Sequence, residues 1–125
     1  MPLAFLSYSH ADIEFAETLA EDLKTAGANV WMDELELEHG IPWDSAIEIA
    51  LNNCVLMVVI LSANSSTSQN VLDEVYSVLA MGKRVIPLLY RDCNVPYRLR
   101  RIQYIDFRTN YVLALRKLAK DLGVK

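Results

Sequence analysis

The sequence alternates regularly between short apolar runs and longer segments in which apolar residues recur at helical spacing. The most informative run, Val55–Leu61, is almost wholly apolar and rich in β-branched residues, which is typical of a parallel strand covered on both faces. Four further runs have strand character: Leu3–Tyr8, Ala28–Met32, Arg84–Tyr90 and Ile102–Phe107. Helical spacing is found in four segments: Ala16–Ala26, Pro42–Cys54, Val71–Leu79 and Tyr111–Leu122.

This alternation predicts an α/β fold. Strands that alternate with helices favour a five-stranded parallel sheet with helices on both faces, joined by right-handed crossovers. The length of 125 residues fits a single domain that spans residues 1–125. An apolar fraction of 53% and a charged fraction of 22% exclude disorder of the whole chain. Two cysteines are too few for a disulfide-rich scaffold.

Charge is distributed unevenly along the chain. Residues 1–82 contain thirteen acidic side chains and one basic side chain, a balance of −12. Residues 83–125 contain eleven basic and three acidic side chains, a balance of +8. This asymmetry predicts a basic surface that meets either nucleic acid or an acidic patch on another copy of the chain, unless the fold mixes the two halves in space.

Nothing in the sequence indicates a membrane partner. The longest apolar run has seven residues, whereas a membrane-spanning helix needs about 20. The N-terminus lacks the basic region of a signal peptide. Cys54 continues an apolar helical stripe and Cys93 lies in a polar segment, without the spacing of a redox motif. We therefore expect a cytoplasmic domain.

Ligands of parallel α/β sheets bind at the carboxyl ends of the strands, so any site is expected there. These ends are Ser7–His10, Asp33 onward, Ser62–Asn70, Tyr90–Cys93 and Asp106–Thr109. The chain has four glycines and none follows the first strand, which excludes a dinucleotide-binding Gly-x-Gly-x-x-Gly turn and a P-loop. A phosphoreceiver domain is excluded because Ser9-His10, Ser62 and Arg108 occupy the places of its acidic pair, aspartate and lysine.

Ser9, His10 and Asp12 are too close in sequence for a hydrolase triad. Ser9 and Asp12 instead have the spacing of a helix N-cap and its acidic partner. His10 and His39, the two histidines, have no spacing to acids or thiols that would indicate a metal site. We therefore predict no metal.

Several groups of residues, spread along the chain in a fixed order, together resemble one family. They are Ala4–Ser9 with Asp12; Val30–Asp33 with Gly40 and Trp43; Leu61-Ser62 with Ser68, Val71 and Asp73–Val75; and Val85–Leu88. From about residue 2 to residue 122 the chain resembles a Toll/interleukin-1 receptor (TIR) domain, which implies a flavodoxin-like fold. It is similar to bacterial or plant members, because the acidic loop after Asp33 lacks the Arg-Asp-x-x-Pro-Gly pattern of animal receptor adaptors.

The resemblance implies an activity. Many TIR domains cleave NAD⁺ between nicotinamide and ribose, using a glutamate of the third helix, and the matching residue is Glu74. NAD⁺ is then the substrate, and no cofactor is implied. A carboxylate can stabilise the oxocarbenium-like sugar of such a cleavage. Considered without the resemblance, Glu74 is a surface carboxylate near a helix N-terminus, where the helix dipole favours it.

The resemblance also implies substrate-binding positions. Ser9 and His10 match positions that contact phosphates or ribose, Trp43 matches an aromatic residue that stacks on a base, and Asp33 can line the pocket. Each has a structural alternative, such as a helix cap for Ser9, a core position for Trp43 or a loop cap for Asp33. Asn70 stands where catalytic members often carry tryptophan, and it cannot stack comparably. This departure implies either that another residue stacks on the substrate or that the domain is not active on its own.

Two functions remain open. One is an NAD⁺ nucleosidase that releases nicotinamide with ADP-ribose or a cyclic variant, activated by self-association in defence or cell-death signalling. The other is a non-catalytic scaffold that binds other TIR domains. The opposite charges of the two halves favour head-to-tail association between copies. Nucleic-acid binding through the arginines at positions 98, 100 and 101 is disfavoured because no recognition motif accompanies them.

Overall fold

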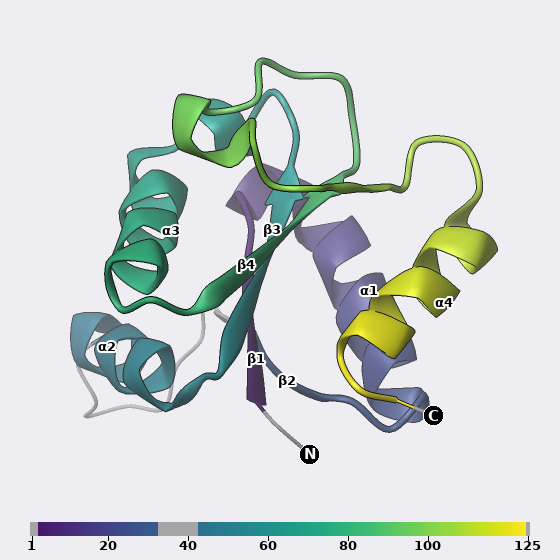
Figure 1. Ribbon diagram of the computed structural model, residues 1–125, viewed down its shortest axis with the longest axis horizontal. Helices are drawn as coiled ribbons and strands as arrows, with labels where there is room; N and C mark the ends of the chain where they lie inside the picture. The colour runs from purple at the N-terminus through teal and green to yellow at the C-terminus, as the bar shows by residue number, and fades with distance from the viewer. Residues whose placement is uncertain (1–2, 33–42, 125) are drawn as a thin grey trace.

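The computed structural model describes residues 3–32 and 43–124, and in this part the chain forms a five-stranded parallel sheet (Figure 1). The strands are β1 (Leu3–Ser7), β2 (Asn29–Met32), β3 (Leu56–Leu61), β4 (Arg84–Leu89) and β5 (Ile105–Asp106). Their spatial order is β2-β1-β3-β4-β5. This confirms the predicted parallel sheet and its strand count, and it places β1 and β3 side by side in the middle.

The helices cover both faces of the sheet, as the alternating pattern predicts. They are α1 (Ile13–Thr25), α2 (Trp43–Asn53), α3 (Gln69–Ala80) and α4 (Tyr111–Asp121). In Figure 1, α1 and α4 lie on one side of the sheet, and α2 and α3 lie on the other. Each helix turns one apolar stripe toward the strands.

The alternation of side chains along β1 divides the core into two clusters. Leu6 and Tyr8 pack with α1 and α4, whereas Phe5 packs with α2 and α3. Because successive strand residues point to opposite faces, Ser7 lies in the row of Phe5, on the side of α2 and α3. β3 is covered on both faces, and its residues from Met57 to Leu61 are all buried.

Cys54 is buried in the cluster that includes α2, as the apolar stripe predicts. Burial raises the pKa of its thiol, although nearby Lys83 acts in the opposite direction. A protonated, inaccessible thiol is consistent with a packing role.

The predicted fifth strand, Ile102–Phe107, is too long. β5 contains only Ile105 and Asp106, because the start of the predicted strand lies in a turn that follows a short 3₁₀ helix (Tyr97–Leu99) and ends at Ile102. The amide of Ile102 donates to the carbonyl of Leu99, so this residue is not available to pair with β4.

The predicted capping pair is half right. Ser9 caps a short 3₁₀ helix (His10–Asp12), with its Oγ accepting from the amide of Ala11 at 3.3 Å. Asp12 is buried, and its carboxylate accepts hydrogen bonds from Ser62 Oγ and Asn64 Nδ2 instead of closing the cap. Burial explains the difference, because a buried carboxylate requires donors and the end of β3 supplies them.

Arginines of the basic half of the sequence form ion pairs with acidic side chains of the same half. Arg84 approaches Asp121 at 3.6 Å, and Arg108 contacts both Asp92 and Asp106. Hydrogen bonds from Arg108 lower the pKa of Asp106 to about 2. These pairs join residues of the basic half to one another, so they do not connect it to the acidic residues of positions 1–82.

Tyr111→Phe is expected to lower the free energy of unfolding by about 1 kcal/mol, because the Tyr111 hydroxyl donates to Asp22 and links α4 to α1. Burial of the Tyr111 hydroxyl raises its pKa, and the contact with Asp22 raises it further. The folded state therefore keeps the hydroxyl proton of Tyr111 at a pH where an unfolded tyrosine, with a pKa of about 10, loses it. The stabilisation from this hydrogen bond is present below that pH and is lost as the pH rises above it. Urea denaturation from pH 8 to 11 should show the two proteins converging in stability. A constant difference across this range would contradict the assignment.

Candidate active site

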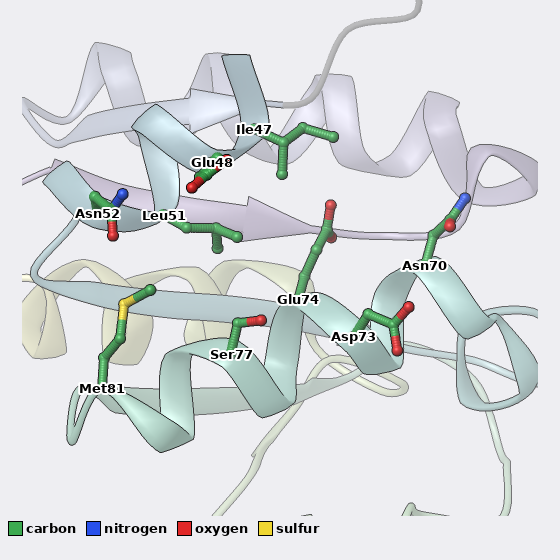
Figure 2. Close-up of a pocket in the computed structure, with 9 residues that line it drawn as sticks. All are labelled: Ile47, Glu48, Leu51, Asn52, Asn70, Asp73, Glu74, Ser77 and Met81. Atoms are coloured by element: carbon green, nitrogen blue, oxygen red, sulfur yellow. The ribbon is translucent and has the colours of Figure 1, made fainter. Parts of the chain in front are cut away.

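Glu74 occupies the second turn of α3 and is buried, with 8% of its surface exposed. Figure 2 shows its side chain extending from α3 toward α2. The adjacent Asp73 is exposed and accepts a hydrogen bond from Gln69 at 2.7 Å. Successive helix residues differ in direction by about 100°, which accounts for the contrast. Glu74 is therefore not the surface carboxylate that the helix position alone indicates.

The carboxylate of Glu74 is held from β1. Ser7 Oγ donates to Glu74 Oε1 at 2.8 Å, and the Ser7 side chain is fully buried. From the sequence, Ser7 is expected at a strand end but receives no role, although one signal is present: a hydroxyl in a strand row that is otherwise apolar. Such a residue needs a polar partner inside the protein.

A cavity of about 420 Å³ lies between α2 and α3 (Figure 2). It combines apolar side chains with carboxylates and other polar groups. Its lining residues are Ile47, Glu48, Leu51, Asn52, Asn70, Asp73, Glu74, Ser77 and Met81. A concave pocket that combines apolar contacts with convergent polar groups is typical of a small-molecule site.

A second cavity, of about 220 Å³, lies where the chain leaves β1 and where α3 begins. It is lined by Tyr8, Ser9, His10, Ser68, Asn70, Val71 and Glu74. Asn70 and Glu74 line both cavities, so Glu74 stands between them. The second cavity lies near the carboxyl ends of β1 and β3. In this strand order the direction of the connections reverses between these two strands, and ligands of such sheets usually bind there.

The structure brings four of the six predicted site residues together. Ser9, His10, Asn70 and Glu74 line the second cavity. Trp43 begins α2, but its side chain is outside the part that the structure describes, and Asp33 also lies outside the described residues. The roles assigned to these positions remain predictions.

The second cavity also bears on the missing stacking residue at Asn70. Two rings line it, Tyr8 and His10, with their centroids 5.9 Å apart. Tyr8 is buried and His10 is partly exposed, so His10 has the more accessible ring face of the two. Ser9 serves as a cap and lines the cavity at the same time, so its two predicted roles are compatible.

The described residues hold neither a cluster of metal-ligating side chains nor a membrane-spanning helix. Within residues 3–32 and 43–124, no three or more His, Cys, Asp or Glu side chains are grouped so as to hold a metal ion. In the same ranges no helix is long and apolar enough to cross a bilayer.

The strand order and the two helical layers define a flavodoxin-like α/β domain, and the buried glutamate between two cavities marks its candidate ligand site. The sequence model of the TIR domain family matches residues 4–119. The chain therefore belongs to the TIR domain family.

A bacterial relative supports the likeness to bacterial members. The protein named NAD(+) hydrolase PdTIR, from Paracoccus denitrificans (strain Pd 1222), is 29% identical over 92 residues. The match covers 70% of this chain and 31% of that protein. The chain thus matches about a third of that relative's length.

Solved structures agree on the fold. The TIR domain of the Toll-related receptor TRR-2 from Hydra magnipapillata has a TM-score of 0.83 at 24% identity, covering 96% of this chain and 97% of that one. The TIR domains of the activated Roq1 resistosome have a TM-score of 0.80 at 19% identity, covering 98% and 99%. Similarity at these identities establishes the flavodoxin-like TIR fold.

Proposed function

We propose that this TIR domain is an NAD⁺ nucleosidase in which Glu74 is the catalytic residue. The observation that carries the proposal is the location of its carboxylate, which is buried in the wall shared by two cavities and held by Ser7. The similarity to a protein named NAD(+) hydrolase supports the same activity. Two adjoining cavities suit a substrate with two nucleotide halves better than a single small metabolite.

The reaction follows from the charge of the substrate. The bond between the ribose C1′ and the nicotinamide nitrogen breaks, and the ring leaves with the electron pair as neutral nicotinamide. Positive charge then develops on the ribose, and the Glu74 carboxylate beside it stabilises this charge. Attack of water at C1′ gives ADP-ribose and a proton, while attack by the adenine base gives a cyclic product. A strong general acid is unnecessary, because the leaving ring already carries the positive charge.

The remaining predicted residues take binding roles in this proposal. Ser9 and His10 line the second cavity and can contact phosphate or ribose oxygens. Trp43 and Asp33 are proposed to complete the pocket near α2. The first cavity carries the carboxylates of Glu48 and Asp73, which suit the cationic nicotinamide half better than the pyrophosphate.

Association between TIR domains is the second part of the proposal. One set of structural relatives is the TIR domains of the activated Roq1 resistosome. In this chain the balance of −12 in residues 1–82 and +8 in residues 83–125 supports head-to-tail contact between copies. We propose that such contact activates the enzyme in defence or cell-death signalling. A scaffold without catalysis is the rival function.

Nicotinamide release from NAD⁺ by the purified protein tests the proposal. Chromatography of the products over a range of protein concentrations, with light scattering on the same samples, relates turnover to assembly. We expect release per molecule to rise as the protein associates, and to fall again when about 0.5 M salt screens the charges. The absence of release above a protein-free control, in samples that light scattering shows to be associated, would favour the scaffold.

A further inference from the structure

Ser7 is an unusual residue for its place in the sheet. It ends β1, in the same row as Phe5, and it is paired in register with Val59 of β3. All three side chains are fully buried. A hydroxyl in such surroundings is unfavourable unless it has a hydrogen-bond partner. A hydrogen-bond partner is therefore needed to account for a serine at this buried position.

That partner is Glu74, and the contact joins two elements that are distant in sequence. Ser7 Oγ donates to Glu74 Oε1 at 2.8 Å, across 67 positions of the chain. Ser7 is paired with β3, and Leu6 before it is paired with both β2 and β3, so the end of β1 is fixed in the sheet. Glu74 reaches its position through several rotatable side-chain bonds. A donor on a rigid strand restricts those rotations and so sets the direction of the carboxylate.

Ser7 does not line either of the two cavities, whereas Glu74 lines both. Ser7 can therefore affect a substrate in these cavities only through the Glu74 carboxylate. We propose that Ser7 is a positioning residue, which holds the Glu74 carboxylate in the orientation that faces the ribose during cleavage. The inference rests on the proposed function, since it assigns Ser7 a role in that same reaction.

The other side of the sheet provides a matched comparison. Ser62 Oγ donates to the buried carboxylate of Asp12, on the face covered by α1. Neither Ser62 nor Asp12 lines the two cavities. Both pairs join a serine hydroxyl to a buried carboxylate, and Ser62 Oγ also accepts from the amide of Ser65. A serine-to-alanine change at Ser62 therefore measures the cost of losing at least one such hydrogen bond away from Glu74.

The test compares kcat and KM for NAD⁺ among the wild type, Ser7→Ala, Ser7→Cys and Ser62→Ala, with folding monitored by circular dichroism. We expect Ser7→Ala to lower kcat by about 10- to 100-fold, because small misplacements of a catalytic group cost that much. KM should change by less than about 3-fold, since the orientation matters in the transition state. Ser7→Cys, with a weaker donor of similar size, should lie between alanine and wild type. Ser62→Ala should keep kcat within about 3-fold.

The outcomes distinguish a failure of the positioning role of Ser7 from a failure of the proposed nucleosidase activity. An active wild type with unchanged kcat in Ser7→Ala overturns the positioning role and leaves the nucleosidase intact. The same holds if Ser62→Ala loses as much as Ser7→Ala, or if the cysteine variant is no better than alanine while folded. A folded, associated wild type without turnover overturns the nucleosidase, and the positioning role with it.

Discussion

Glu74→Gln is expected to lower nicotinamide release by about 10²–10³-fold, the range seen when one preorganised electrostatic contact to a transition state is removed. Glutamine has nearly the same shape and can still accept a hydrogen bond from Ser7, which contacts Oε1. It lacks the negative charge that stabilises the cationic ribose. The variant therefore removes the proposed chemistry while it retains the geometry of the site. Initial rates of nicotinamide release at saturating NAD⁺ measure the effect.

Glu17→Gln is the control for this substitution. Glu17 is exposed on α1, on the opposite side of the sheet from Glu74. The change from acid to amide is identical, and the net charge of the chain changes by the same amount. We expect Glu17→Gln to retain its rate within about 2-fold, as is usual for surface substitutions. Equal rates for wild type and Glu74→Gln would remove Glu74 from the mechanism.

Phe5→Ala is expected to lower the free energy of unfolding by about 3–5 kcal/mol. Phe5 is fully buried in the central part of the sheet, and its ring stacks on Trp31 with centroids 4.9 Å apart. Its removal leaves a cavity beneath α2 and α3 that the neighbouring strands can fill only in part. Domains of this size are stable by about 5–15 kcal/mol in total, so the loss is a large fraction of the stability.

Urea denaturation with circular dichroism measures this loss. Ile49→Ala provides the comparison, because Ile49 lies on α2 with 59% of its surface exposed. We expect that variant to change the free energy of unfolding by no more than about 0.5 kcal/mol. A loss below about 1 kcal/mol for Phe5→Ala, a value typical of an average substitution, would show that this part of the sheet is less tightly packed than described.

The fold was predictable from sequence because its signals are local. A wholly apolar run such as Val55–Leu61 has few alternatives to a strand buried on both faces, and β3 confirms this. The fifth strand was overestimated because the apolar and β-branched residues near Ile102 fit a strand equally well. The turn that ends at Ile102 depends on a contact with Leu99, which residue composition does not reveal.

The site was predictable only where the family resemblance provided positions. It identified Glu74 and three of its neighbours around the second cavity. It did not identify Ser7, and Asp12 was assigned to a cap although it binds the end of β3. Both contacts join residues 50 or more positions apart, and such pairs leave no periodic pattern in the sequence. Their partners become visible only when the sheet brings β1, β3 and α3 together.

We propose above all that the carboxylate of Glu74 stabilises the ribose cation that forms as the bond between nicotinamide and ribose breaks. The most direct test of this role is the rate of nicotinamide release by wild type and Glu74→Gln at equal concentration, in samples that light scattering shows to be equally associated. We expect rapid release by the wild type and a rate about 10²–10³-fold lower for the variant. Equal rates in the two samples, or no release by the associated wild type, would contradict this role of Glu74.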